Sequence, residues 1–266
     1  MPPVPNWIFT IKSASLLSLI LASNINAKSL STISSYEDTY VLGSYTSSLN
    51  KDDYIAGGFE GAEDLQNLEA KFKFSFSFPL LQFGPSSSLV AAYSQTSLWQ
   101  VANNKISSPF RETNYKPQLF LMFRPDLFVI NNIEIGYKHE SNGQTASLSR
   151  SWDRTYIALE LLDGPFEYGV HAWSIFGKTG ENPDIGEFYA PWNAWMKFHT
   201  GMGVFDFRGF YNFDTDRSGL EAGYTFFMND FVGLYTQVFH GYGETLIEYD
   251  HSHSRIGIGL KLVNWQ

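Results

Sequence analysis

The chain has 266 residues, a formal net charge of −9 and no run rich in lysine or arginine, so it lacks the clustered positive charge of a nucleic-acid-binding protein. It contains no cysteine, which excludes disulfides, thiolate metal sites and a cysteine nucleophile. Aromatic residues make up 17% of the chain and there are 22 glycines, a composition that favours β structure over a helical bundle.

The N-terminal segment predicts an exported protein. A single lysine precedes a short apolar run from Ala14 to Ala22, and small residues lead from there to Ala27. This order is typical of a secretory signal peptide, and the apolar run is too short to span a bilayer as a helix. We expect residues 1–27 to be removed and residues 28–266 to form a single domain. A buried N-terminal helix is the alternative.

The rest of the chain reads as short strands separated by turns. Apolar and polar residues alternate between clusters of Gly, Pro, Asn, Asp and Ser, most clearly in KFKFSFSF, which puts Phe72, Phe74, Phe76 and Phe78 on one face. About twelve such segments begin near residues 39, 68, 87, 114, 130, 151, 165, 192, 203, 217, 230 and 255. An even number of alternating strands predicts an all-β fold, a closed transmembrane antiparallel β-barrel of about twelve strands.

A soluble β-sandwich also alternates and is the competing interpretation. Two features favour the membrane. Large apolar side chains fill one face of most strands, and tryptophan and tyrosine crowd strand ends, as in YAPWNAW. In a barrel the charged residues of the opposite faces, such as Lys73, Glu134 and Asp206, point into the lumen and are expected to pair with one another.

The stretch IEIGYKHES, residues 133–141, ends an apolar strand face on a histidine and a serine. Strand periodicity puts His139 and Ser141 on the lipid-facing side, where polar groups cost free energy unless they are used. The same parity carries Asp153 of the next strand outward, and a hairpin can lay it beside His139. These are the nucleophile, base and orienting group of acyl transfer, here directed at a lipid. Without wider context, a girdle histidine beside a loop serine is the simpler interpretation.

The wider context resembles outer-membrane phospholipase A of Gram-negative bacteria. The resemblance rests on YKHESNG followed by SRSWDR, on SSPFRETNYKPQLFL, and on GYGETLIEYD near the end of the chain. It implies a twelve-stranded barrel of the bacterial outer membrane that hydrolyses the acyl esters of phospholipids and lysophospholipids (A1/A2 activity). It also implies that calcium activates the enzyme and that the active form is a homodimer.

The resemblance further implies roles for individual residues. Ser141 corresponds to the nucleophile, His139 to the general base and Gly143 to a backbone amide of the oxyanion hole. Asp153 stands where the family commonly has asparagine, and this departure adds a charge beside lipid. The implied calcium ligands are neutral oxygen atoms: the carbonyl of Gln144, the hydroxyl of Ser149, and Ser107 of the partner subunit.

Strand parity also predicts that Gln95 faces lipid, because it shares a strand face with Leu89, Tyr93 and Trp99. An amide exposed to hydrocarbon is costly when unpaired, but it is adhesive when it pairs with its twin across a dimer axis, and the resemblance implies that use. A register shift that turns Gln95 inward is the alternative.

A second functional hypothesis is a non-catalytic barrel, a pore or structural protein that keeps the fold without the activity. His251 and His253 lack a third ligand, so we expect them in a solvated loop rather than in a metal site. The chain ends in NWQ, whereas barrel proteins usually end in an aromatic residue, and the resemblance does not explain Gln266.

Overall fold

The computed structural model describes residues 33–127, 129–177 and 179–263; the expected signal peptide and Gln266 lie outside them. The strands of the described residues are β1 (Ser34–Ser35), β2 (Tyr40–Thr46), β3 (Leu68–Gly84), β4 (Ser87–Trp99), β5 (Phe110–Phe123), β6 (Ile130–Ser141), β7 (Ser151–Asp163), β8 (Phe166–Phe176), β9 (Trp192–His199), β10 (Gly203–Asn212), β11 (Arg217–Phe227), β12 (Val232–Gly241) and β13 (His253–Leu262). The helices are α1 (Lys51–Ala56) and α2 (Ile185–Phe188), with single 3₁₀ turns η1 (Ala62–Asp64), η2 (Asn104–Ile106) and η3 (Ala146–Leu148).

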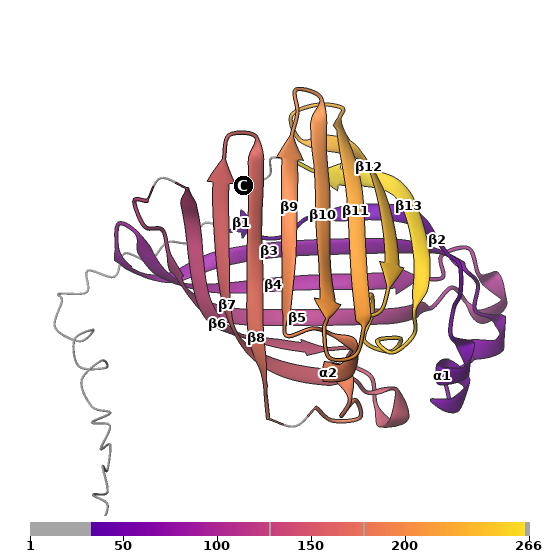
Figure 1. Ribbon diagram of the computed structural model, residues 1–266. Helices are drawn as coiled ribbons and strands as arrows, with labels where there is room; N and C mark the ends of the chain where they lie inside the picture. The colour runs from indigo at the N-terminus through magenta and orange to yellow at the C-terminus, as the bar shows by residue number, and fades with distance from the viewer. Residues whose placement is uncertain (1–32, 128, 178, 264–266) are drawn as a thin grey trace, which may run out of the picture.

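The strands form one closed antiparallel barrel (Figure 1). Strands β2 to β13 follow one another around the wall, each hydrogen-bonded to the next, and β13 pairs with β2 to close the ring. The short β1 adds to β3. The predicted barrel of about twelve strands is confirmed, and the β-sandwich is wrong because the sheet closes on itself. Within the described residues, no helix is long and apolar enough to cross a bilayer.

The strands alternate between an apolar outer face and a polar inner face. In β13, Ile256, Ile258 and Leu260 are exposed while Arg255 and Lys261 are buried. The outer side chains are suited to hydrocarbon, and closure of the sheet pairs the backbone groups that lipid cannot satisfy. One sequence pattern therefore produces both the lipid-facing wall and the lumen.

Ion pairs fill the lumen, as strand parity predicts. Arg111 and Arg255 both bind Glu69, with N–O distances of 2.9 and 2.8 Å. Lys71 binds Glu244 at 2.9 Å, and all five of these side chains are almost fully buried. Charged groups removed from water need partners of this kind, because an unpaired buried charge is very costly.

The two ends of the barrel differ. Because neighbouring strands are antiparallel, the connections after β2, β4, β6, β8, β10 and β12 all lie at one end, and these include α1, α2 and the three 3₁₀ turns. Figure 1 shows α1 and α2 beyond the strand ends, with tight turns at the other end. In outer-membrane barrels the longer loops are extracellular. We call this end the long-loop end.

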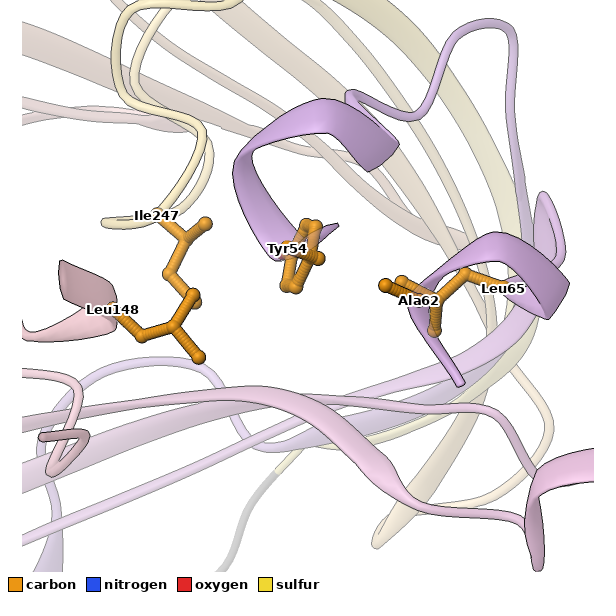
Figure 2. Packing of buried hydrophobic residues seen from close by; sticks show 5 residues of the cluster. All are labelled: Tyr54, Ala62, Leu65, Leu148 and Ile247. Atoms are coloured by element: carbon orange, nitrogen blue, oxygen red, sulfur yellow. The ribbon is translucent and has the colours of Figure 1, made fainter. Parts of the chain in front are cut away.

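A small apolar cluster holds the loops at this end together. It consists of Tyr54, Ala62, Leu65, Leu148 and Ile247, which come from α1, η1 and the residue after it, η3 and the β12–β13 loop. Tyr54 lies between Leu148 and Ile247 on one side and Ala62 and Leu65 on the other (Figure 2). The same β12–β13 loop directs Glu244 into the lumen, where its carboxylate lies 2.6 Å from His253 Nε2. His253 is buried, so the prediction of a solvated loop is wrong for this residue.

Candidate active site

The candidate catalytic residues lie on the outer wall, on the paired strands β6 and β7. Four outward-facing pairs succeed one another toward the long-loop end: Ile135 with Ile157, Tyr137 with Thr155, His139 with Asp153, and Ser141 with Ser151. Ile135 and Ile157 are each 51% exposed, as expected of side chains in contact with lipid. The wall therefore changes from aliphatic to polar over these four pairs of one ladder.

His139 and Asp153 form a hydrogen bond across this ladder. The distance from His139 Nδ1 to Asp153 Oδ1 is 2.7 Å, and the two side chains are 36% and 27% exposed. A carboxylate only accepts, so the proton of the neutral imidazole lies on Nδ1. Nε2 is then left free to take a proton, which is the tautomer required of a general base.

Ser141 lies on the same strand and the same face as His139. Two residues of a strand span about 7 Å, so the two side chains project side by side from the wall. Among the hydrogen bonds of the described residues, none joins the Ser141 hydroxyl to His139. The structure thus places the candidate nucleophile, Ser141, beside the candidate base, His139. The two side chains are not hydrogen-bonded, as is common in unliganded enzymes.

Gly143 follows Ser141 by two residues and has a φ of +66°, which a side chain would disfavour. A Cβ atom at this position would lie 3.0 Å from the ring of Tyr115, which stands opposite Ser141 on β5. In the described part of the chain, the Gly143 amide donates to no acceptor. A free backbone amide next to the serine is what an oxyanion hole requires.

Asn142 fixes the loop that carries this glycine. Its buried side chain donates from Nδ2 to the Leu148 carbonyl at 2.8 Å. Its Oδ1 accepts from the backbone amides of Gln144 at 3.2 Å and Arg150 at 3.0 Å. The conformation of residues 142–150 is therefore set from within the loop.

The residues expected to bind calcium lie on two loops. Gln144 and Ser149 flank η3 between β6 and β7, whereas exposed Ser107 follows η2 between β4 and β5. In the described residues no group of three or more His, Asp and Glu side chains is placed to hold a metal. The available donors are neutral hydroxyl and carbonyl oxygens, which suit calcium when water completes its shell.

The loop of residues 142–150 carries a positively charged side chain, Arg150. Arg150 Nη1 donates to the carbonyls of Ser147 and Ser149, at 2.7 and 3.0 Å. Arg150 also attracts Asp53 of α1, but burial and the neighbouring Asp250 outweigh it and raise the pKa of the Asp53 carboxyl. The loops at this end of the barrel therefore carry charges of both signs.

The inner side of β6 is anchored directly behind the site. Glu140, between His139 and Ser141, points into the lumen and accepts from Lys116 Nζ at 2.9 Å and Trp152 Nε1 at 3.1 Å. It also binds Arg154. These contacts tie β6 to β5 and β7, so the outward residues stand on a rigid part of the wall.

Comparison with known proteins identifies the family of the chain. The family model of phospholipase A1 matches residues 18–262. The chain belongs to the phospholipase A1 family. Phospholipase A1 of Escherichia coli K12 is 40% identical over 237 residues, which are 87% of this chain and 81% of the relative. The Klebsiella pneumoniae protein of the same name is 40% identical over 85% of this chain and 81% of its own length.

Solved structures agree with the barrel. Outer membrane phospholipase A from Escherichia coli has a TM-score of 0.85 and 40% identity, covering 88% of this chain and 99% of that one. The Salmonella typhi outer membrane phospholipase, a dimer with bound calcium, has a TM-score of 0.85 and 39% identity. The match covers 88% of this chain and 93% of that one. As a member of the phospholipase A1 family, the chain is a carboxylic ester hydrolase of the outer membrane.

In this phospholipase A1 family member Gln95 faces outward, and no register shift occurs beside it. Its Oε1 accepts from the Tyr93 hydroxyl at 2.8 Å and its Nε2 donates to Ser97 Oγ at 3.1 Å. Ser97 in turn contacts Thr113 Oγ1 at 3.0 Å. The alternative of an inward-facing Gln95 is therefore wrong. Its amide already has partners within the chain, which lowers the cost of keeping it on the wall.

Sequence reasoning missed Tyr137, which it counted only as part of the apolar face. The Tyr137 hydroxyl donates to Asp153 Oδ1 at 2.5 Å. The available signal was strand register: once His139 is placed opposite Asp153, the residue two positions before His139 becomes the diagonal neighbour of Asp153.

Proposed function

We propose that this chain is a calcium-dependent phospholipase A that hydrolyses acyl esters of phospholipids and lysophospholipids and is activated by homodimerisation. The observation that carries the proposal is the hydrogen bond between His139 and Asp153 on the lipid-facing wall, two residues from Ser141. A substrate attacked from this wall must itself lie in the membrane, which points to lipid esters.

In the first half of the reaction, Ser141 Oγ attacks the ester carbonyl carbon while His139 Nε2 takes the hydroxyl proton. Asp153 accepts the Nδ1–H hydrogen bond and stabilises the imidazolium that forms. The Gly143 amide donates to the oxyanion of the tetrahedral intermediate. The imidazolium then gives its proton to the departing alcohol oxygen, and the acyl group remains as an ester on Ser141.

In the second half, water attacks the acyl-enzyme. As the water oxygen bonds to the carbonyl carbon, His139 Nε2 takes a proton from the water. The Gly143 amide stabilises the second oxyanion as it did the first. Collapse of this intermediate breaks the bond to Ser141 Oγ, which recovers its proton from His139. The products are a free fatty acid and the regenerated serine.

For calcium we propose the Gln144 carbonyl and the Ser149 hydroxyl, with Ser107 of the partner subunit. The support is the loop of residues 142–150, which carries the first two groups and is fixed by Asn142, and the calcium-bound dimer of the Salmonella typhi relative. When bound, calcium would supply positive charge near the oxyanion. A site built from two subunits would make activity depend on the dimer.

We also propose that residues 1–27 are a signal peptide and that residues 28–266 fold as a single barrel domain. The mass of the protein recovered from outer membranes tests the cleavage. A mass that still includes residues 1–27 would contradict it.

The test is fatty-acid release from mixed phospholipid micelles, with calcium and with EDTA. Wild type is compared with Ser141→Ala and with Ser254→Ala, another outward-facing serine at the long-loop end. We expect calcium-dependent release that is lost in Ser141→Ala and kept in Ser254→Ala. A folded wild-type barrel that releases nothing at any calcium concentration would favour the passive barrel instead.

A further inference from the structure

Asp153 receives two hydrogen bonds on one oxygen. His139 Nδ1 lies 2.7 Å from Oδ1, and the Tyr137 hydroxyl donates to the same atom at 2.5 Å. Within the described residues, no hydrogen bond reaches Oδ2. The two donors come from the same face of β6, one directly opposite Asp153 and the other one step deeper in the membrane.

The position of Tyr137 matters because of what lies beyond it. The next outward pair on the ladder is Ile135 and Ile157, which are half exposed and face lipid. Tyr137 therefore stands between the carboxylate and the aliphatic part of the wall. Its ring is apolar and its hydroxyl is polar, a combination that suits the boundary between hydrocarbon and headgroups.

A carboxylate in this place has a need that an amide lacks. A negative charge beside hydrocarbon is costly unless donors satisfy it, and hydrogen bonds to charged acceptors are about twice as strong as neutral ones. Both donors here go to Oδ1, the atom whose equivalent an asparagine would also present. The geometry thus accommodates either residue, but only the aspartate depends strongly on a second donor.

We propose that Tyr137 is a positioning residue for the hydrolysis. Its hydroxyl holds Asp153 Oδ1 in line with His139 Nδ1 and satisfies the charge that this chain carries in place of the family's asparagine. This inference rests on the proposed function, because it assumes that His139 is the general base. Within the described residues, the hydroxyl of Tyr137 is hydrogen-bonded to Asp153 alone, so Tyr137 acts through Asp153.

The chain offers a closely matched control. Tyr211 on β10 is an outward-facing tyrosine whose hydroxyl donates to a carboxylate, Asp216 Oδ1, at 2.8 Å. Tyr137 and Tyr211 are each 40% exposed. A role in the aromatic girdle is common to both, whereas a contact with the orienting carboxylate belongs to Tyr137 alone. The two Tyr→Phe variants separate these roles.

The experiment measures kcat and KM on mixed micelles for Tyr137→Phe and Tyr211→Phe, each in the wild-type and the Asp153→Asn background. In the wild-type background we expect Tyr137→Phe to lower kcat about tenfold with little change in KM, as for loss of a hydrogen bond to a charged group. In the Asp153→Asn background the same change should cost less than about threefold, because the charge is gone. Tyr211→Phe should leave both constants unchanged.

Three outcomes would overturn the inference. They are an unchanged kcat in Tyr137→Phe, an equal loss in both backgrounds, and a loss that Tyr211→Phe shares. A heat-shift gel confirms that each variant is a folded barrel. Ser141→Ala, measured in parallel, separates the two proposals: residual activity there contradicts the proposed function itself, whereas an inactive Ser141→Ala with a fully active Tyr137→Phe contradicts only the role of Tyr137.

Discussion

Two histidines on the outer wall near the long-loop end each contact the residue opposite on the next strand. His139 on β6 binds Asp153 at 2.7 Å. His240 on β12 binds Ser254 on β13, with 2.8 Å between Nδ1 and Oγ. Of these two pairs, only the second contains a serine in contact with the histidine, because Ser141 makes no such contact in the described structure.

The difference between the pairs shows which contact matters. The bond to Asp153 fixes the ring and the tautomer of His139, and the free amide of Gly143 lies nearby. In the described residues no carboxylate is hydrogen-bonded to His240, so nothing there would stabilise an imidazolium. A histidine and a serine become a hydrolytic pair only when a third group orients the base and a donor awaits the oxyanion.

The largest expected effect comes from replacing each of the two histidines in turn. We expect His139→Asn to lower kcat for fatty-acid release by about 10⁴-fold, because it removes the proposed acceptor of the Ser141 proton. His240→Asn should change kcat less than twofold. The measurement is steady-state release from mixed micelles in calcium. Comparable losses in the two variants would mean that the outer wall as a whole, not one oriented base, supports activity.

The next effect concerns stability rather than chemistry. Beside Ser254, Arg255 turns into the lumen and donates to Glu244 at 2.7 Å. Burial opposes ionisation of Glu244, but Arg255, Lys71 and His253 outweigh it and hold the pKa of this loop carboxyl well below its usual range. We expect Glu244→Gln to lower the free energy of unfolding by about 3 kcal/mol at pH 7, with kcat unchanged. Urea unfolding in micelles measures it.

The pH dependence follows from the direction of that shift. Because the pKa of Glu244 is lower in the folded state, its ionised carboxylate stabilises the fold fully at pH values above the unfolded pKa of about 4.3. This stabilisation is lost as the pH falls through the folded pKa. The difference between wild type and Glu244→Gln should therefore be constant from pH 7 to about 5.5 and shrink in more acid solution. Glu187→Gln, which breaks an exposed pair with Arg217, is the control and should cost under about 1 kcal/mol. A difference that grows as the pH falls would contradict this.

A smaller effect sharpens the role of the orienting group. We expect Asp153→Ala to lower kcat about 30-fold, because His139 loses its acceptor. Asp153→Asn keeps an oxygen in the position of Oδ1 and should lose less than about tenfold. The same assay checks both variants. If alanine and asparagine behave alike, the acceptor at this position does not orient the base.

The smallest effect concerns Gln95 on β4, which lies on the same outer wall two strands from β6. We expect Gln95→Leu to raise the dimer dissociation constant in calcium about fivefold. This is the size of effect measured for one polar contact between helices in a membrane. Thr236→Val, an outward polar change on β12, should leave the constant unchanged. Sedimentation equilibrium in micelles measures both. An equal change in the two variants would remove Gln95 from the interface.

Much of the wall was predictable because a strand has a period of two. Parity alone put His139, Ser141, Asp153 and Gln95 on the outer face, and turn residues located the strands. β5 is the exception: it begins at Phe110 rather than near residue 114. Arg111 and Glu112 resemble loop residues in the sequence, yet both are buried in the lumen, where Arg111 is paired with Glu69.

What could not be predicted depends on contacts between distant segments. The buried position of His253 follows from Glu244, which folds into the lumen from a loop that reads as solvated. Tyr54 becomes part of a core only when α1 meets Leu148 and Ile247. The role of Tyr137 needed the register between β6 and β7, which the sequence does not state. The period of a strand predicts which face each side chain occupies, but its contact partners depend on strand register and loop packing.

The most direct test of the central claim is which serine an electrophile modifies. The folded protein, in micelles with calcium, is treated with a long-chain sulfonyl fluoride, and the labelled peptide is identified by mass spectrometry. We predict stoichiometric labelling of Ser141 that is lost in His139→Asn and kept in His240→Asn. Labelling of Ser254, or labelling of Ser141 that survives in His139→Asn, would contradict the claim that an oriented His139 activates Ser141.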